Sequence, residues 1–485
     1  MTKFGRGNYV AELAEFSLKT KFEDIPKQIV DLCLQRLTDT VAVTFAGISE
    51  PASRIAADFA RSMRGDGTSV VVGGGFSTAS DLAAFANAIS AHIHDWDDTS
   101  TTNIHPSVTV FPAVLAIGEA QGASGPDCLA AYIVGVEISM RMARGLYPGL
   151  YLRGFHPTGT VGSFAAAAAA AKLLDLQPKQ AEMAFSLAIA QSAGMMCSKG
   201  TMQKAFQAGN AARAGVFASL LAKESFTGVS EILSAEQGVF DAFLHGADGT
   251  GKAVDFANTN DIKAVGASVE TFDAAAIIAE LGVRWELLRD WAIKPYPVGA
   301  VRQTLLEAAI LLAKQYEVDP DEIESVELFV SQFCINVDHP RPSSYLDSRF
   351  SHTYAAAVAL IDRKAGIEQF GPNRFKDAKV HALLSRVKLI ADPKLKNPAL
   401  EGFPTTIVVH MRNGATHSVY VEKHKGQVGR PTTWEDTREK YDSCAPLALN
   451  LTQSEELWHL IRDLENQPTI TRLSAILGAA RPQTS

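Results

Sequence analysis

The sequence predicts a mainly α protein: a large all-α helical domain with a smaller α+β lid domain inserted late in the chain. Apolar residues recur at steps of three and four over most of the first 270 residues, which is the spacing of one helical face. From about residue 290 the pattern alternates in twos between helical stretches, as in strands. The chain of 485 residues, 47% of them hydrophobic, is long enough for two domains with buried cores.

The first part of the chain has the clearest helical periods. In Ile25–Phe45 the apolar residues keep to one face, and Glu50-Pro51 ends that helix. The pattern of residues 69–75 predicts a brief strand that is followed by three glycines. No G-x-G-x-x-G or G-K-[ST] motif continues them, so we interpret them as a turn between strand and helix and not as a phosphate site. The other helices expected here are Pro51–Met63, Ala79–Ile93, Val108–Gly122, Pro126–Ala143, Gly159–Leu174, Pro178–Gly194, Phe206–Glu224 and Val229–Leu233.

The later part mixes strands and helices. Arg412-Asn413-Gly414 separates two alternating runs, and Asn-Gly in that position is a strong hairpin signal. We expect three or four strands with helices on one face, and then a return to helix. The strands are Glu324–Cys334, Arg386–Ala391, Thr405–Met411 and Ala415–Val421, and the helices are His352–Asp362, Asp377–Leu384, Trp434–Cys444, Ser454–Asn466 and Ile470–Ala480. The helical domain then comprises residues 1–285 and 430–485, and the lid residues 290–425.

Composition limits the classes of function. The formal net charge of -8 argues against nucleic acid or an anionic membrane as a general partner, but not against a small anionic substrate. The sequence contains no run of about 18 apolar residues free of charges, so it predicts no membrane span. The N-terminus lacks the apolar core of a signal peptide. The five cysteines are far apart with no C-x-x-C pair, which indicates free thiols in a reducing compartment and predicts a cytoplasmic protein.

One loop concentrates the polar chemistry. From His92 to His105 the chain holds three aspartates and three histidines, between two almost wholly apolar segments. Because charges near an apolar core are costly unless they are paired or used, we expect this loop to lie in a cleft. Its Asp95-x-Asp97-Asp98 pattern is open to three interpretations: a divalent-metal site, an acid motif like the D-x-D-D of terpene cyclases, or a substrate-site loop in which Asp95 orients a histidine or lysine.

Three residues elsewhere carry weaker signals. Lys204 lies just before a small-residue helix whose N-terminus would favour an anion, although a lone lysine is usually a surface residue. His156 precedes the Ala-rich helix and is equally consistent with a helix cap. Lys294 lies at the expected domain junction, where ligand clefts tend to form.

Together these segments resemble the MmgE/PrpD family, which includes 2-methylcitrate dehydratase, cis-aconitate decarboxylase and iminodisuccinate epimerase. The resemblance covers nearly the whole chain and implies a helical domain with a late α+β lid, and a homodimer. By resemblance to the decarboxylase members, the active-site positions are Asp95, Thr99, His105, His156, Lys204 and Lys294. The matching segments are Asp95–Thr99 with His105-Pro106, Gly154–Thr158, Lys204–Ala212, Lys294–Pro297 and the lid segment Asp347–Ala355.

The chain departs from the family on the lid side. Val301-Arg302-Gln303 stands where many members have a histidine, and residues 425–431 replace the usual K-G-x-P-x-N-P. These departures leave the substrate open. With Lys294, we expect Arg302 and Tyr354 to bind substrate.

These observations predict a cofactor-independent lyase that acts on a small di- or tricarboxylate, either 2-methylcitrate dehydratase-like or cis-aconitate decarboxylase-like. Fixed cations would stabilise a carbanion formed beside a carboxylate, and a histidine would move the proton. We expect His105 to be the main proton carrier, assisted by His156, with Lys204, Asp95 and Thr99 in the catalytic group and no metal. The alternatives are an epimerase of a dicarboxylate such as iminodisuccinate, a metal-dependent hydrolase and a non-catalytic binding protein.

Overall fold

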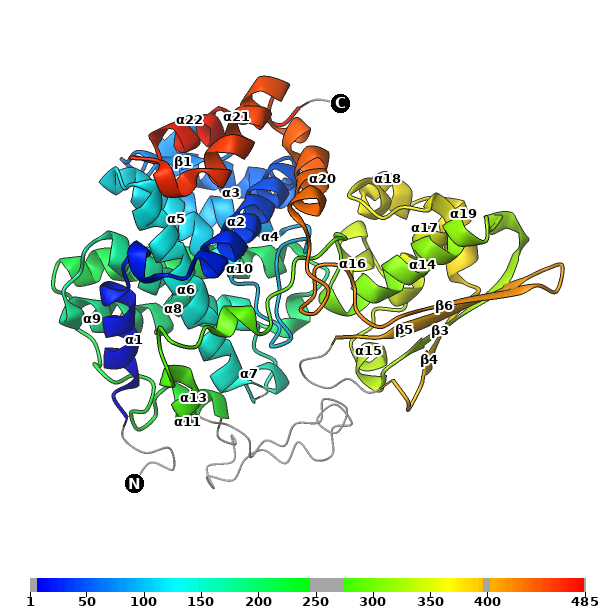
Figure 1. The fold of residues 1–485 in the computed structure, drawn as a ribbon, viewed down its shortest axis with the longest axis horizontal. Helices are drawn as coiled ribbons and strands as arrows, with labels where there is room; N and C mark the ends of the chain where they lie inside the picture. Colours follow the sequence, from blue (N-terminus) through cyan, green and yellow to red (C-terminus); the bar gives the residue numbers. More distant parts are fainter. Residues whose placement is uncertain (1–6, 148, 245–273, 396–401, 484–485) are drawn as a thin grey trace.

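Two lobes of unequal size make up the computed structural model, which describes residues 7–147, 149–244, 274–395 and 402–483. Figure 1 shows a large lobe built of helices beside a smaller lobe with a sheet. The predicted fold class, mainly α with a small α+β part, is confirmed. The proposed domain boundaries at 285, 290, 425 and 430 stay predictions. No helix in the described part of the chain is both long and apolar enough to cross a membrane.

The helical lobe takes in both ends of the described chain. Its helices agree with the predicted ones to within a few residues, apart from Val229–Leu233, which forms turns instead of a helix. The longer helices are α1 (Tyr9–Lys19), α2 (Lys27–Gly47), α3 (Pro51–Ser62), α4 (Ser80–His92), α5 (Ser107–Gln121), α6 (Gly125–Leu146), α8 (Pro157–Leu173), α9 (Pro178–Ile189), α10 (Met202–Lys223), α20 (Trp434–Cys444), α21 (Leu451–Arg462) and α22 (Thr471–Ala479). The shorter ones are α7 (Gly149–Leu152), α11 (Val239–Leu244) and α13 (Ala275–Ile278).

The expected turn at 69–75 is the tip of a small hairpin. Strand β1 (Ser69–Val71) pairs antiparallel with β2 (Phe76–Thr78), so the glycines join two strands and not a strand and a helix. Gly73 and Gly75 have positive φ angles of 78° and 75°, which glycine adopts without the steric cost of a Cβ.

Helix α8 lies at the centre of the helical lobe, and its alanines explain how so many helices reach it. Residues 165–171 are all alanine and fully buried, and α8 packs against α5, α6, α9 and α10. The approach of α10 is so close that a Cβ on Gly215 would lie 2.5 Å from the Cβ of Ala166. Small side chains on both helices therefore let their backbones come together and place the start of α10 beside the acidic loop.

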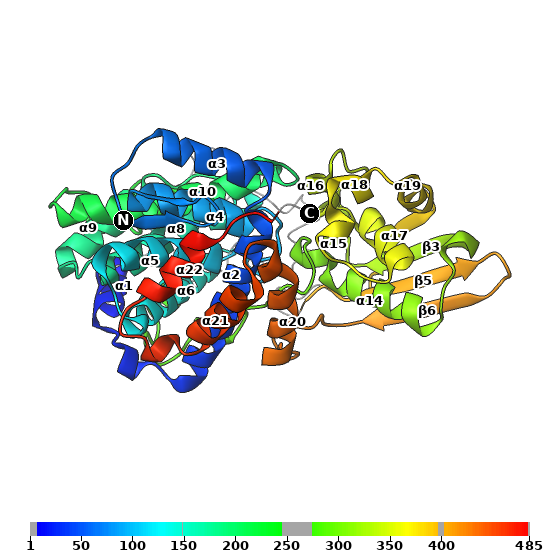
Figure 2. The same cartoon turned by 90° about the horizontal axis from the view of Figure 1, so that it is seen from above.

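The smaller lobe contains one four-stranded sheet in the order β4-β3-β5-β6. Strand β3 (Ile323–Val330) pairs parallel with β4 (Val387–Ala391) and antiparallel with β5 (Thr405–Met411), which continues through the predicted Asn413-Gly414 hairpin to β6 (Thr416–Val421). Figures 1 and 2 show the main helices on one face of this sheet. The helices of the lobe are α14 (Gln303–Gln315), α15 (Gln332–Asn336), α16 (Tyr345–Ser348), α17 (His352–Asp362), α18 (Pro372–Phe375) and α19 (Ala378–Leu384).

Candidate active site

The acidic loop between α4 and α5 is buried and tightly bonded. Asp95 has a left-handed φ of 50°, a conformation that costs about 1–3 kcal/mol and persists only where the surroundings enforce it. Asp98 accepts hydrogen bonds from the backbone and the hydroxyl of Ser107 at the start of α5, and from the indole of Trp291 at 2.7 Å. Burial raises the pKa of Asp98 to about 7. The loop is therefore anchored to α5 on one side and to the segment that enters the lid on the other.

The linking segment, residues 291–299, carries Lys294 to the loop. Thr99 and Ala292 exchange backbone hydrogen bonds of 2.9 and 2.8 Å, which aligns the two chains antiparallel. Two residues further on, the Lys294 ammonium lies 2.6 Å from Asp95 Oδ1 and donates to the Asp95 carbonyl at 2.5 Å. Lys294 is completely buried.

Lys204 reaches the same carboxylate from the first turn of α10. Its ammonium lies 3.2 Å from Asp95 Oδ1 and donates to Nε2 of His92 at 2.8 Å. Burial alone would raise the pKa of Asp95, but the two lysine ammonium groups hold that pKa well below its usual range. Asp95 is therefore a carboxylate shared by two cations from distant parts of the chain.

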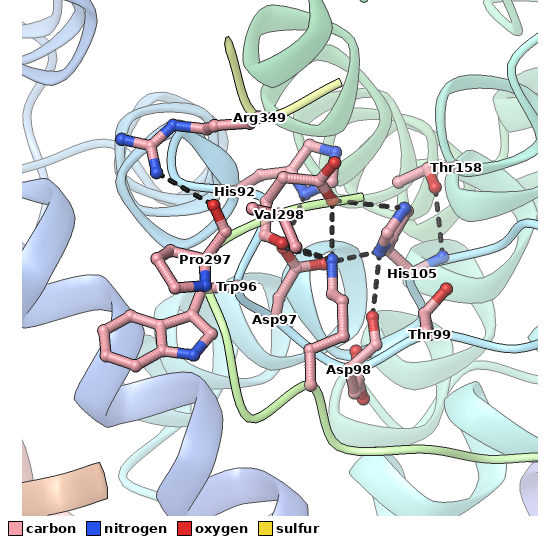
Figure 3. Close-up of polar contacts among 12 residues, drawn as sticks. His92, Trp96, Asp97, Asp98, Thr99, His105, Thr158, Pro297, Val298 and Arg349 are labelled. Atoms are coloured by element: carbon pink, nitrogen blue, oxygen red, sulfur yellow. Dashed lines mark hydrogen bonds and ion pairs between the residues drawn. The ribbon is translucent and has the colours of Figure 1, made fainter. Parts of the chain in front are cut away.

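His105 is positioned as a base. Its Nδ1 lies 2.9 Å from the Asp98 carbonyl and 2.8 Å from Asp97 Oδ2 (Figure 3). Both neighbours can only accept a hydrogen bond, so Nδ1 carries the proton and Nε2 has a free lone pair. Burial lowers the pKa of His105 to about 4, although Asp97 opposes the shift. The imidazole is therefore neutral near pH 7, with Nε2 at 3.8 Å from Asp95 Oδ1.

Two further imidazoles complete the cluster. The ring centroids of His92 and His156 lie 4.7 and 6.3 Å from that of His105. Nδ1 of His156 lies 2.7 Å from the Gln207 amide oxygen, and its Nε2 is buried without a partner. Burial, and then the charge of Lys204, keep the pKa of His156 well below its usual value. His156 is thus neutral and keeps one unused acceptor.

A cavity opens beside this cluster, between the two lobes. The helical lobe contributes Asp95, His105 and Lys204, and the lid contributes Arg302 and Phe350. The other lining residues are Ser100, Thr101, Asn103, Tyr147, Tyr151, Lys199, Gly299, Ala300, Val301, Phe333, Val337 and Phe403. A site formed by both lobes fits the expectation of a cleft at the domain junction.

Some of the predicted site residues line the cavity, and others lie next to the lining residues without reaching it. Thr99 lies in the backbone pairing with Ala292, and Lys294 lies behind Asp95, so its ammonium does not line the cavity. His156 lies behind His92.

Tyr354 lies in the lid core, away from the cavity. It is completely buried, and its hydroxyl donates to the Gln369 carbonyl at 2.8 Å. Its ring lies 5.7 Å from the rings of Phe370 and Phe375. The aromatic side chain completes the apolar core of the lid and is not among the residues that line the cavity, and its substrate-binding role stays a prediction.

Four residues that the sequence analysis did not select also belong to the site. They are His92, Asp97, Lys199 and Gln207. Gln207 could have been found from its position, since it follows Lys204 by three residues on the same helical face. Nothing in the local sequence distinguishes Lys199.

Two residues at the departures from the family pattern, Gln303 and Gly426, support the linking segment, whereas their neighbours Val301 and Arg302 line the cavity. The Gln303 side chain donates to the carbonyls of Tyr296 and Val298, both at 2.9 Å, and accepts from the Tyr296 backbone at 3.1 Å. Gly426 accepts from the Ile293 backbone and has a φ of 98°, and a Cβ there would lie 2.2 Å from the Ile293 carbonyl oxygen. Both residues therefore hold the backbone on either side of Lys294.

The imidazole and carboxylate groups of the site are of the chemical types that bind metal ions. Ligand atoms of His92, His105 and His156, and those of Asp95, Asp97 and His105, lie within 4.8 Å of one another. The charges do not fit, however, because the ammonium groups of Lys204 and Lys294 already bind Asp95. A dication would have to lie beside two fixed cations.

Comparison with known proteins agrees with this geometry. The model of the MmgE/PrpD N-terminal domain matches residues 11–251, and that of the MmgE/PrpD C-terminal domain matches residues 296–466. The chain is 26% identical over 474 residues to the cis-aconitate decarboxylase of Homo sapiens, covering 95% of this chain and 93% of that protein. It is 25% identical to the cis-aconitate decarboxylase-like protein oryM of Aspergillus oryzae, over 97% and 98% of the two chains. It is also 25% identical to the cis-aconitate decarboxylase of Aspergillus terreus, over 98% and 96%.

We expect the purified protein to hold no stoichiometric divalent metal, because two ammonium groups occupy the Asp95 carboxylate. Elemental analysis should find less than one metal per chain, and dialysis against EDTA should leave the melting temperature unchanged. A bound ion would stabilise the folded state by mass action, so the dialysed protein is also titrated with Mg²⁺, Mn²⁺ and Zn²⁺. A melting temperature that falls on dialysis and recovers with one of these ions would overturn this expectation and favour the hydrolase alternative.

Proposed function

Because the chain belongs to the MmgE/PrpD family, we propose that it is a cofactor-independent lyase that acts on a small di- or tricarboxylate by proton transfer next to a carboxylate. The observation that carries the proposal is the neutral His105, whose free Nε2 lies beside a cavity lined by lysine and arginine. The names of the relatives favour a decarboxylase acting on cis-aconitate or a close analogue. Dehydration of a 2-methylcitrate-like substrate uses the same groups.

The proposed chemistry needs a carbanion and a proton carrier. In decarboxylation, the bond to one carboxylate breaks, CO₂ leaves and the electron pair is shared with the neighbouring conjugated carboxylate. The ammonium of Lys204 and the guanidinium of Arg302 line the cavity and stabilise this charge. His105 then delivers a proton to carbon. The bound carboxylates raise the pKa of this imidazole from its low resting value, so substrate binding itself favours the protonated form.

Lys294 has a positioning role in this proposal. Its ammonium faces Asp95 and not the cavity, so it fixes the carboxylate that in turn aligns Lys204 and His105. His92 links Lys204 to Asp97 by contacts of 2.8 and 3.0 Å, which keeps its imidazole neutral with the proton on Nδ1.

The proposal is tested by incubating the enzyme with cis-aconitate, citrate, 2-methylcitrate and iminodisuccinate in deuterated water and following each by NMR. We expect one of these substrates either to lose CO₂ and take up one deuterium at the carbon that carried it, or to lose water with the proton leaving the carbon beside a carboxylate. Deuterium uptake with inversion and no loss of atoms would instead support the epimerase alternative. The absence of turnover and exchange with all four would contradict the proposed substrate class.

The role of His105 is tested with His105→Asn. The asparagine amide can donate to the Asp98 carbonyl in place of Nδ1, but no group replaces Nε2. Losing a proton carrier costs about 10²–10⁴ in rate, so kcat should fall by that factor with a modest change in KM, and deuterium exchange should vanish. His459→Asn, at an exposed histidine on α21, should change neither. A His105→Asn enzyme with unchanged kcat would disprove the assignment and favour Lys204 or His156.

We also infer a homodimer that forms through one face of the helical lobe. Large apolar side chains are exposed on α3 and α10: Ile55 is 63% exposed, and Phe59 and Phe206 are each 48% exposed. Phe85 joins the two helices through edge contacts with Phe59 and Phe206 at 6.3 and 5.9 Å. A continuous apolar face of this kind is typical of an interface.

Light scattering should therefore give twice the chain mass of 52.0 kDa. Replacing Phe59 and Phe206 by serine should shift the protein toward the monomer, because it removes apolar area from the proposed interface. The matched control is the exposed Leu451 on α21, whose replacement by serine should leave the dimer intact. A wild-type protein of monomer mass at micromolar concentration would contradict the inference.

A cytoplasmic location is part of the same proposal. All five cysteines are free thiols, and four of them are buried. Burial raises the pKa of Cys33, Cys128, Cys334 and Cys444, so these thiols stay protonated and unreactive. Free thiols are what a reducing compartment maintains.

A further inference from the structure

The charges around Asp95 balance one another, and the cavity lining holds two further cationic side chains. Asp95 and Asp97 are anionic and face the ammonium groups of Lys204 and Lys294, so this centre has no net charge. Lys199 and Arg302 also line the cavity. Arg302 shares Asp338 with His352, and the charge of Lys199 is left over once the centre is neutralised.

The charge of Lys199 faces mainly other cations. It lies just before α10 and is partly buried, and its ammonium is 5.8 Å from the centre of the Tyr151 ring. Within the described part of the chain, no hydrogen bond or ion pair reaches this ammonium. The charged groups that it faces are Arg302, Lys204 and, more weakly, Asp95. A lysine that faces two other cations and contacts the face of a ring is an incomplete anion site.

Arg302 is buried and only partly satisfied. It is 2% exposed, donates from Nη2 to the Val337 carbonyl at 2.9 Å, and lies 3.6 Å from Asp338. Asp338 is shared, since it also binds His352 at 2.7 Å. The Nε of Arg302 is buried and has no hydrogen-bond partner among the residues that the structure describes. An arginine fork with unused donors beside a cavity can bind a carboxylate.

We propose that Lys199 and Arg302, in the same cavity as His105, form a second carboxylate subsite that selects substrates with a carboxylate remote from the reacting carbon. This inference rests on the proposed function and extends it from small polycarboxylates in general to a specific pair of residues. The subsite draws one residue from each lobe, so a bound polycarboxylate also ties the lid to the helical lobe.

The subsite predicts a dependence of binding on pH. Burial, together with Arg302 and Lys204, lowers the pKa of Lys199 to about 7. The protonated form, which binds a carboxylate, is complete below this pH and is lost above it. Affinity for a polycarboxylate should therefore decrease as the pH rises above about 7, by up to about tenfold per pH unit.

The test measures binding and not turnover, by calorimetry with tricarballylate, an unreactive tricarboxylate, and pentanoate, which has a single carboxylate. Lys199→Gln should weaken tricarballylate binding about ten- to a hundredfold and leave pentanoate binding unchanged. Lys199→Arg should restore tricarballylate binding and remove its decrease between about pH 7 and about pH 9, because arginine stays charged. Lys223→Gln, which removes the same charge at the far end of α10, is the matched control and should have no effect.

Equal losses for both ligands, or no loss for either, in Lys199→Gln would overturn the inference. A flat pH profile in the wild type would do the same. These outcomes are distinct from failure of the proposed function, in which the wild-type enzyme binds no tricarballylate and turns over none of the four substrates. Arg302→Gln should match Lys199→Gln, but because Arg302 also bonds to Val337, the decision rests on the Lys199 variants, whose ammonium makes no hydrogen bond or ion pair with the residues that the structure describes.

Discussion

A single carboxylate oxygen, Asp95 Oδ1, lies within 3.2 Å of two lysine ammonium groups, and the two lobes meet around it. Lys204 comes from α10 and Lys294 from the segment that leads into the lid, 199 residues along the chain from Asp95. An unpaired buried charge costs several kcal/mol, so each of the three groups is tolerable only because the others are present. The strained backbone of Asp95 persists for the same reason.

This arrangement determines the protonation states of the site. The lysines balance the aspartates, and burial then favours the uncharged form of each imidazole. The result is a buried group of neutral histidines beside a cavity that Lys199 and Arg302 also line. A polycarboxylate completes this balance by supplying negative charge, and in doing so it changes the proton affinity of His105. Substrate binding and proton transfer are therefore linked through the same electrostatics.

Helix α20 holds the backbone that carries Asp95 and Lys294 on the side away from the cavity. Lys440 on α20 donates to the carbonyls of Trp96 and Lys294 at 2.7 and 3.0 Å, and it pairs with the buried Asp39 on α2 at 2.6 Å. Figures 1 and 2 both place α20 where the lobes meet. The return of the chain to the helical lobe after the lid thus holds the backbone next to both Asp95 and Lys294.

The sequence by itself determined the elements and the location of the site. Apolar periods of 3.6 and 2 residues depend only on neighbouring positions in the sequence, so α17, β5 and α20 have the predicted bounds. The density of charge between apolar segments identified the loop from His92 to His105. Only the tertiary structure decided which side chains face the cavity. It turned Tyr354 into the lid core, put Lys294 behind Asp95 and brought Lys199 into the same cavity lining as His105. Those positions depend on how helices and lobes pack across long stretches of chain, and local spacing carries no information about that packing.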